Sequence, residues 1–322
     1  MKHLLTGAAM ALAAMTGPAL AEGHGDYPNR PIMLMVSYGA GGATDFQARI
    51  VTMTAGNDDA LGMPIAIVNR PGAGGRVGWN WFATQADSDG YTLGAYNIPH
   101  FIAQSIEGGV EYTAESFEPI ANWGADPAVF VVATDSEFQT MADVIAYATE
   151  NPGGLTFSGA GLFVGHHIAA LQLEQAAGVD LAYIPNNAGG AGAMRAVIAG
   201  EVMGGINNLS DAFRAREAGN VRILGVFDLE RNAFIEDVPT MMEQGYDIDN
   251  ASVNYRGIMV PAGTPPEIID YLAEVVPTMF ENSRVQARMQ AGGSPMNIMT
   301  RDEVLEMWAQ RQETLEALLA DF

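Results

Sequence analysis

A glycine-rich turn near the N-terminus offers the clearest chemistry in this sequence. The segment from Tyr27 to Asp45 reads as a buried strand, a turn and the start of a helix. The strand covers Ile32–Val36, the turn is Gly39-Ala40-Gly41-Gly42, and Thr44 and Asp45 open the helix. The first N–H groups of a helix have no partner within it and carry partial positive charge. A strand that ends in glycines before a helix therefore predicts a site for a carboxylate or a phosphate.

Three more glycine-rich turns follow candidate strands, at Asn69–Gly75, Ser158–Gly161 and Asn187–Gly192. Loops of this kind at the carboxyl ends of strands build the ligand crevice of an open α/β sheet. The Gly39–Gly42 turn does not match G-x-G-x-x-G and has no acidic ribose partner, which disfavours a dinucleotide. The simplest role of Asp45 is to accept backbone N–H bonds at the helix start, and this is compatible with orienting the loop.

Asparagine and histidine side chains add further candidates. Asn97, Asn122, Asn207 and Asn208 follow candidate strands, where a neutral amide can contact ligand oxygens, although asparagine is equally an ordinary turn residue there. His166 and His167 are adjacent, so one helix cannot direct both at one metal ion, and no H-E-x-x-H motif is present. We expect a histidine in polar or ligand contact, or an exposed one, and no metal site.

No catalytic constellation stands out in the chain. No serine occupies a G-x-S-x-G turn, and no acidic residue has an evident partner. The sequence therefore nominates no catalytic residue and no cofactor. A secreted hydrolase with an unrecognised pair of acids stays open as an alternative function.

The composition narrows the choice of partners. The chain has 322 residues, with 15 basic and 38 acidic side chains and a net charge of −23. Such a surface repels nucleic acid and anionic lipid, so neither is expected as a partner. The chain contains no cysteine, which excludes disulfides, thiolate metal sites and cysteine nucleophiles. An anionic ligand must then be held by local dipoles against an unfavourable long-range field.

The N-terminus has the layout of a secretory signal. Lys2 and His3 precede an apolar run from Leu4 to Met15, and Ala19-Leu20-Ala21 follows as a small-residue cleavage site. The apolar run is too short to span a bilayer. We expect cleavage after Ala21 and a soluble exported protein, the alternative being an uncut segment that serves as an anchor.

Short apolar runs alternate with helical patterns along the chain, which is typical of an α/β fold with mostly parallel strands. The expected strands are Ile32–Val36, Ile65–Val68, Leu93–Ala95, Ala128–Val132, Thr156–Ser158, Leu181–Ile184, Gly204–Asn207, Ile223–Val226 and Gly257–Val260. The expected helices are Thr44–Thr54, Val77–Gln85, Met141–Glu150, Phe163–Ala177, Ala191–Ala199, Pro265–Asn282 and Arg301–Leu319. No linker separates two domains, so we expect two lobes that the chain crosses near Pro127–Val132 and Asn254–Pro261.

Several motifs, in this order, resemble the periplasmic solute receptors of the tripartite tricarboxylate transporter system, also called the Bug family. The resemblance runs from Tyr27 to Phe322. It is carried by Tyr27–Ile32, Gly41–Asp45 with Arg49, Asn69–Gly75, Asp89–Gly94, Asp237–Thr240 with Glu243 and Gly245–Tyr246, and Val260–Pro265. Each motif alone is weak, but together and in register they make the resemblance strong.

The resemblance implies a two-lobed, hinged fold of the type II periplasmic-binding-protein (Venus-flytrap) class. Each lobe of this α/β fold is a mostly parallel sheet flanked by helices. The expected division is a signal peptide at 1–21, a first lobe formed by 27–127 plus 253–322, and a second lobe at 128–252.

The resemblance also implies that the lobes close on a small carboxylate. The loops Tyr38–Asp45 and Ser158–Gly161 would hold it through backbone N–H groups and bound water. The expected ligand-binding residues are Tyr38, Gly39, Ala40, Gly41, Gly42, Thr44, Asp45, Ala73, Asn97, Ser158, Gly159, Ala160, Gly161, His167 and Asn207.

This chain departs from the family pattern at two places. Phe163 and Val164 replace a glycine and a serine common in relatives, and Asn186 and Asn187 replace a tyrosine–lysine pair. These departures predict a site that is less cationic and more apolar than that of a citrate receptor, suited to a mono- or dicarboxylate or an aromatic acid.

The expected function is that of a periplasmic receptor, monomeric and without enzymatic activity. It would bind a small organic carboxylate and deliver it to the membrane subunits of a tripartite tricarboxylate transporter. The alternatives are a receptor of another uptake system, for amino acids or other organic acids, and a sensor accessory that docks to a signalling protein.

Overall fold

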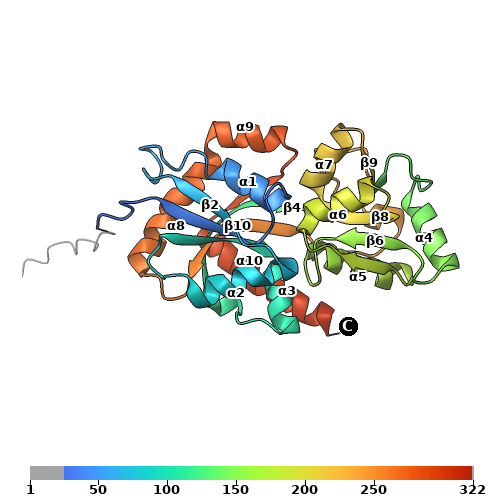
Figure 1. The fold of residues 1–322 in the computed structure, drawn as a ribbon, viewed down its shortest axis with the longest axis horizontal. Coiled ribbons are helices and arrows are strands. Elements are labelled where there is room, and N and C mark those ends of the chain that lie inside the picture. The colour runs from blue at the N-terminus through green and yellow to red at the C-terminus, as the bar shows by residue number, and fades with distance from the viewer. Residues whose placement is uncertain (1–24, 321–322) are drawn as a thin grey trace, which may run out of the picture.

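The computed structural model describes residues 25–320 (Figure 1), so the predicted signal peptide at 1–21 lies outside the described residues. Strands and helices alternate along the chain as predicted. The strands are β1 (Ile32–Val36), β2 (Ile65–Asn69), β3 (Thr92–Ile98), β4 (Phe117–Asp126), β5 (Ala128–Ala133), β6 (Thr156–Gly159), β7 (Ala182–Pro185), β8 (Gly204–Asn208), β9 (Val221–Phe227), β10 (Asn254–Pro261) and β11 (Met296–Met299).

The α-helices fill the connections between these strands. They are α1 (Ala43–Val51), α2 (Arg76–Gln85), α3 (His100–Glu107), α4 (Met141–Glu150), α5 (Gly165–Ala177), α6 (Gly189–Ile198), α7 (Leu209–Glu217), α8 (Pro266–Glu281), α9 (Ser283–Ala291) and α10 (Arg301–Leu319). Within 25–320, none of them is long and apolar enough to cross a membrane.

The strands form two sheets. One has six strands in the order β11-β4-β10-β3-β1-β2, and the other has five in the order β7-β6-β8-β5-β9. In the first sheet β1, β2, β3 and β4 run in one direction and β10 and β11 run against them. In the second sheet only β5 is reversed. The predicted α/β fold with two lobes and mostly parallel sheets is confirmed.

The chain passes from one sheet to the other over very short distances. Strand β4 ends in the first sheet at Asp126, and β5 begins in the second sheet at Ala128. Strand β10 belongs to the first sheet again and begins at Asn254. The two sheets lie side by side along the long axis of the molecule (Figure 1). We therefore propose lobe boundaries at 27–127 plus 253–322 and at 128–252.

Five elements are absent from the sequence-based expectation: β4, β11, α3, α7 and α9. In β4, Pro119, Asn122 and Gly124 interrupt the apolar run, and its pairing with β10 contains two register shifts. Strand β11 has four residues and α3 has eight, which leaves little room for a periodic pattern. Helices α7 and α9 are mostly polar, so their apolar stripes are weak.

Helix α5 begins later than expected, at Gly165 instead of Phe163. The backbone of Phe163 has a φ of 54°, in the left-handed region that residues with side chains rarely adopt. Val164 is extended and forms the N-cap. The turn before α5 is therefore wider than the sequence pattern predicts.

Side chains of β5 alternate between two apolar cores on opposite faces of the second sheet. Phe130 and Val132 pack in the core that α4 and α5 cover. Val129 and Val131 pack in the core that α6 and α7 cover. Helices thus cover both faces of this sheet, as an α/β fold requires.

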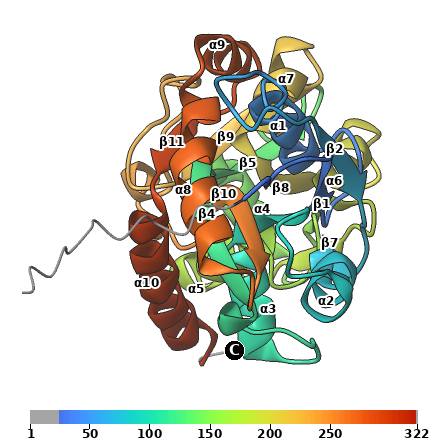
Figure 2. The same ribbon diagram turned by 90° about the vertical axis from the view of Figure 1, so that its left-hand side faces the viewer.

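Helices also cover both faces of the first sheet. Phe101 of α3 contacts Trp79 of α2 and Trp308 of α10, with ring centroids 6.1 and 5.0 Å apart. On the other face, Phe280 of α8 contacts Trp123 of β4 at 6.0 Å, and α9 packs on α1 and α8. Figure 2 shows α1 and α9 on one side of this sheet and α2 and α3 on the other.

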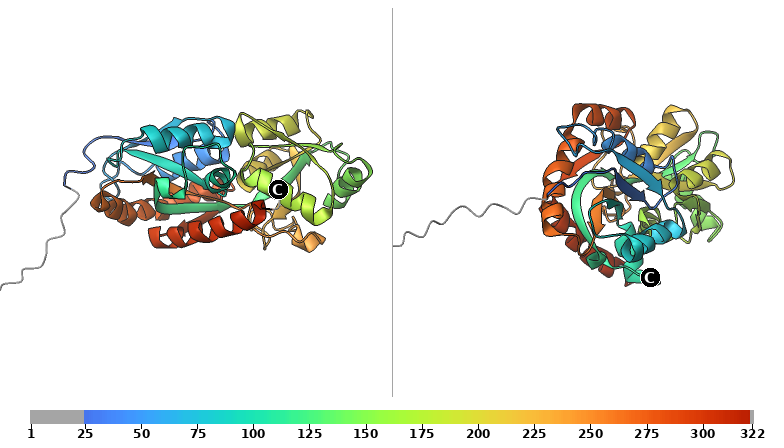
Figure 3. Two further views of the ribbon diagram at one scale, coloured as in Figure 1. Left: turned by 90° about the horizontal axis from the view of Figure 1, so that it is seen from below. Right: turned by 60° about the vertical axis from the view of Figure 1, so that its left-hand side comes forward.

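The last helix connects the two lobes at the side away from α1. Helix α10 runs along the first lobe (Figure 3) and packs against α3 and β4. Its Arg311 donates from Nη1 to the carbonyl oxygen of Asn250 at 2.9 Å. Asn250 precedes the return of the chain into β10, so this bond ties α10 to the second crossing.

A buried ion pair occupies the first crossing. Asp126, at the end of β4, accepts a 2.6 Å hydrogen bond from Nη1 of Arg256 on β10, and both side chains are 0% exposed. Gln47 of α1 donates to the same carboxylate from Nε2 at 3.1 Å, and the backbone N–H of Ser210 in α7 donates at 3.1 Å. Elements of both lobes therefore satisfy one buried carboxylate.

The Asp126→Asn variant tests this ion pair, because it leaves the Arg256 guanidinium buried without a counter-charge. We expect it to lower the free energy of unfolding by about 3 to 5 kcal/mol, measured by urea unfolding. The matched control is Asp237→Asn, which breaks an ion pair between Arg216 and a 65% exposed Asp237 side chain. That change should cost about 1 kcal/mol or less. Equal losses in the two variants would contradict the importance of the buried pair.

Candidate functional site

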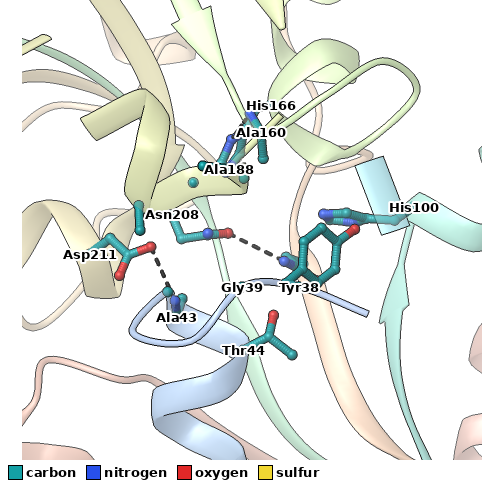
Figure 4. Close-up of a pocket in the computed structure, with 15 residues that line it drawn as sticks. Tyr38, Gly39, Ala43, Thr44, His100, Ala160, His166, Ala188, Asn208 and Asp211 are labelled. Carbon is teal, nitrogen blue, oxygen red and sulfur yellow. Dashed lines mark hydrogen bonds between the residues drawn. The ribbon is translucent and has the colours of Figure 1, made fainter. Parts of the chain in front are cut away.

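A narrow cavity lies where the two lobes face each other (Figure 4). It encloses about 350 Å³ of space between atoms, part of it open to solvent. Its lining comes from both lobes and consists of Tyr38, Gly39, Gly42, Ala43, Thr44, His100, Ala160, His166, Ala188, Gly189, Gly190, Ala191, Asn208, Asp211 and Asn254. None of these side chains is an arginine or a lysine.

The turn before α1 is held in place by Asp45. Its Oδ2 accepts the backbone N–H of Gly41 at 2.9 Å, and Arg49 and Asn69 donate to the same carboxylate. Burial raises the pKa of Asp45, but the hydrogen bonds from Arg49, Gly41 and Asn69 outweigh it and hold the pKa below its ordinary value. Asp45 therefore orients the loop, in agreement with one reading of the sequence, and its own side chain lies outside the cavity lining.

The first N–H group of α1 also has an acceptor, which comes from the other lobe. The N–H of Ala43 donates to Oδ2 of Asp211 at 3.2 Å (Figure 4). The other oxygen of this carboxylate pairs with Arg214, one turn further along α7. Burial raises the pKa of Asp211, and Arg214 opposes the increase.

At the start of α6 the first N–H group, that of Gly189, donates to the carbonyl oxygen of Asn186 at 3.0 Å. Within residues 25–320 no acceptor is found for the next two, those of Gly190 and Ala191. Gly190 and Ala191 lie in the first turn, where no intrahelical acceptor exists, and both line the cavity. Asn207 holds this turn in position by donating from Nδ2 to the carbonyl oxygen of Gly190 at 2.9 Å. Free N–H groups at a helix start form a site for an anion.

A buried neutral histidine adjoins these N–H groups. The Nδ1 of His166 accepts the backbone N–H of Ala160 at 3.0 Å, which places the ring proton on Nε2. That Nε2 is buried and has no hydrogen-bond partner of good geometry within 25–320. Burial lowers the pKa of His166 to about 4, although the nearby Asn208 side chain opposes the change. His166 therefore presents an N–H donor, and no charge, to the cavity near pH 7.

A second buried histidine lines the opposite side of the cavity. His100 begins α3, and its Nδ1 has no hydrogen-bond partner in the described part of the chain. Burial holds its pKa well below the ordinary value, and the neighbouring His166 and Arg256 act in the same direction. This ring is therefore also neutral near pH 7.

A chain of amide and hydroxyl groups forms the floor of the cavity. Asn97 donates from Nδ2 to Thr44 Oγ1 at 2.9 Å and to Asn254 Oδ1 at 3.1 Å. Asn254 in turn donates from Nδ2 to Asn208 Oδ1 at 3.2 Å. Arg256 donates from Nε to Thr44 Oγ1 at 3.2 Å, which joins this floor to the buried ion pair.

The structure brings one third of the expected ligand-binding residues to the cavity. Those in its lining are Tyr38, Gly39, Gly42, Thr44 and Ala160. Those outside the lining are Ala40, Gly41, Asp45, Ala73, Asn97, Ser158, Gly159, Gly161, His167 and Asn207. Asn97 and Asn207 support lining residues through the hydrogen bonds described above, and Gly41 and Asp45 bond to each other.

The Ser158–Gly161 loop contributes only Ala160 because its other groups are occupied within the second lobe. Ser158 donates from Oγ to the carbonyl oxygen of Ile184 at 2.8 Å. The Tyr183 hydroxyl donates to the carbonyl oxygen of Gly161 at 2.6 Å, and a Cβ on Gly159 would lie 2.4 Å from that hydroxyl. The start of α6 adds Gly189, Gly190 and Ala191 to the lining of the cavity.

His167 also lies away from the cavity, and its neighbour His166 lines it instead. The Nδ1 of His167 accepts the backbone N–H of Phe163 at 3.2 Å, and its ring contacts Tyr183 with centroids 4.8 Å apart. Adjacent residues of a helix point about 100° apart, so a shift of one position changes the environment of the ring. Because His166 and His167 are adjacent, the position at which α5 begins decides which of the two rings lines the cavity.

The remaining lining residues had weaker signals in the sequence. The glycine-rich Asn187–Gly192 segment was visible as a turn before a helix, and the structure places it at the α6 start. Asn208 follows Asn207 at the end of a strand. Asp211 and Asn254 had no distinguishing pattern, because distant segments bring them to the cavity.

Metal binding has little support in this geometry. Among residues 25–320, no group of three or more histidine, aspartate or glutamate side chains is arranged to hold a metal ion. The lining offers neutral donors together with one carboxylate.

Comparison with known proteins identifies the family. The model of the tripartite tricarboxylate transporter family receptor matches residues 48–317. The chain is 30% identical to protein BugT of Bordetella pertussis over 297 residues, which cover 91% of this chain and 89% of BugT. Both matches span nearly the whole described chain.

Solved structures agree with this match. The structure of the periplasmic binding protein BugD superposes with a TM-score of 0.83 at 25% identity, covering 92% of this chain and 98% of BugD. A TctC solute-binding protein from Polaromonas, solved with no ligand, superposes with a TM-score of 0.67 at 26% identity, covering 92% of this chain and all of that protein. The chain therefore belongs to the receptor family of the tripartite tricarboxylate transporters, as its motifs predict.

Proposed function

We propose that this receptor is exported to the periplasm, binds a small organic carboxylate between its lobes and delivers it to the membrane subunits of its transporter. The observation that supports the carboxylate is the set of free donors on one wall of the cavity. Among the described residues no acceptor is found for the N–H groups of Gly190 and Ala191, and the buried Nε2–H of His166, near the Asn208 side chain, makes no hydrogen bond of good geometry. A carboxylate supplies acceptors for several donors at once.

Neutral donors suit an anion that must be released again. The helix start provides partial positive charge without a cationic side chain, and the −23 net charge of the chain opposes anion binding at long range. Closure of the lobes would remove water and strengthen these local interactions. We propose ligand contacts at Tyr38, Gly39, Gly42, Thr44 and Ala160 in addition to the three donors.

We propose binding without turnover, by a monomer. Acid–base hydrolysis with two carboxyl groups needs an acid and a base near the reacting bond, and Asp211 is the single carboxylate among the lining residues. The hydrolase alternative therefore lacks support at this cavity.

A panel of carboxylates tests the ligand class. We expect at least one mono- or dicarboxylate to raise the melting temperature of the mature protein. Ligand at one hundred times its Kd stabilises the folded state by about 2.7 kcal/mol. The uncharged amide of the same acid serves as the control and should give no shift, because it presents no carboxylate. Native mass spectrometry of the purified protein would reveal a ligand that is already bound. A shift with neutral solutes only would contradict the proposal.

Gly190→Ala tests the site at the α6 start. The added Cβ would lie 3.2 Å from Asn207 Oδ1 and 3.5 Å from His166 Cε1, inside the donor cluster. We expect the variant to bind its acid at least about tenfold more weakly, as for the loss of one hydrogen bond to a charged group, and to remain folded. The control is Gly56→Ala, whose Cβ would meet Pro64 at an ordinary 3.8 Å outside the cavity. Unchanged affinity in Gly190→Ala would place the ligand elsewhere.

The neutral histidine predicts a pH dependence of stability. The pKa of His166 is about 4 in the folded protein and near 6.5 when exposed. Between these values the unfolded chain binds a proton that the folded chain does not, so the free energy of unfolding falls as the pH drops from 6.5 to 4. In this window we expect the free energy of unfolding of wild type to fall by up to about 1.4 kcal/mol more per unit of decreasing pH than that of His166→Gln. Urea unfolding at several pH values measures the difference, and parallel profiles would argue against a buried neutral ring.

A further inference from the structure

One charged side chain lines the cavity, and it has the same sign as the proposed ligand. Asp211, on the first turn of α7, is 8% exposed and belongs to the lining. Its partner Arg214 lies outside the lining, over the ring of Phe46 at 4.3 Å and bonded to the carbonyl oxygen of Gly292. The guanidinium of Arg214 therefore pairs with Asp211 outside the cavity lining and contributes no group to it.

The Oδ2 atom of Asp211 lies beside the free donors of α6. It accepts the N–H of Ala43, and a Cβ built on Gly190 would lie 3.4 Å from it. Oδ2 can accept a further hydrogen bond, because each carboxylate oxygen can accept more than one. A ligand carboxylate bound to the N–H groups of Gly190 and Ala191 would therefore have Asp211 as a close neighbour.

Two neighbouring carboxylates repel unless a donor lies between them. A second acid group on the ligand would add repulsion, because no lining side chain is cationic. A hydroxyl or ammonium group next to the ligand carboxylate would instead donate to Oδ2 and remove the repulsion. A donor at this place forms a hydrogen bond to a charged acceptor, which is among the stronger kinds.

We propose that Asp211 determines the ligand class: a small monocarboxylate with a hydroxyl or ammonium group on the carbon next to its carboxylate. On this assignment Asp211 accepts the hydrogen bond of that group and excludes dicarboxylates. The proposal rests on the proposed function, since it assumes that the ligand carboxylate binds at the α6 start.

Four acids of similar size test the proposal by isothermal titration calorimetry. L-lactate and L-alanine differ from propionate by one hydroxyl and one ammonium group, and succinate differs from it by a second carboxylate. We expect wild type to bind L-lactate or L-alanine at least about tenfold more tightly than propionate, and succinate more weakly than propionate. The comparison of L-lactate with L-alanine decides between hydroxyl and ammonium.

Asp211→Asn removes the charge and keeps an oxygen that can accept the Ala43 N–H. We expect the variant to bind L-lactate and L-alanine with affinities within about threefold of that for propionate. Its affinity for succinate, relative to that for propionate, should rise at least about tenfold. The matched control is Asp237→Asn. Asp237 is exposed and pairs with Arg216, which lies in α7 as Asp211 does. The control variant should leave all four ratios unchanged. If Asp211→Asn does not fold, the wild-type ratios alone decide.

The outcomes separate this inference from the proposed function. If wild type binds succinate as tightly as L-lactate and L-alanine, the proposed role of Asp211 is wrong and the receptor function stands. The same holds if wild type binds none of the four acids but binds a larger one. Unchanged ratios in a folded Asp211→Asn variant also overturn it. A protein that binds no carboxylate at all overturns both.

Discussion

The cleft of this receptor is organised by the need of helix-start N–H groups for acceptors. Such groups have no partner within their own helix, and leaving them buried without one is costly. The chain supplies acceptors for the first N–H group of α1, through Asp211, and for the first N–H group of α6, through the carbonyl oxygen of Asn186. At α6 the first-turn N–H groups of Gly190 and Ala191 remain open to the cavity. The proposed ligand supplies the acceptor that the chain omits there.

Positive charge is compensated below the cavity, and no arginine or lysine lines it. Arg256 is fully buried but faces Asp126, so the crossing between the lobes holds a neutral pair. Arg256 also donates to Thr44, which shares the hydrogen-bonded floor with Asn97 and Asn254. The crossing and the floor of the cavity therefore belong to one connected polar network. The proposed closure of the lobes on a ligand would act on this network.

The sequence predicted the fold well where local patterns are strong. Buried strands such as Ile32–Val36 and glycine-rich turns at strand ends follow from local chemistry, and the α/β class and the family are confirmed. Elements with weak or interrupted patterns, such as β4 and α9, were missed because pairing partners and neighbouring helices stabilise them. The start of α5 was placed too early, since the left-handed backbone of Phe163 has no signature in the sequence.

The sequence by itself determined the types of chemistry available: helix starts after glycine-rich turns, a strongly acidic chain without cysteine, and no motif for catalysis. Tertiary structure alone decided which of these groups meet. It placed His166 and not His167 in the cavity lining, paired the first N–H group of α1 with Asp211, and left the N–H groups of Gly190 and Ala191 for a ligand. The physical reason is that the fold decides which donors and acceptors meet, and the groups around this cleft come from segments distant in the chain.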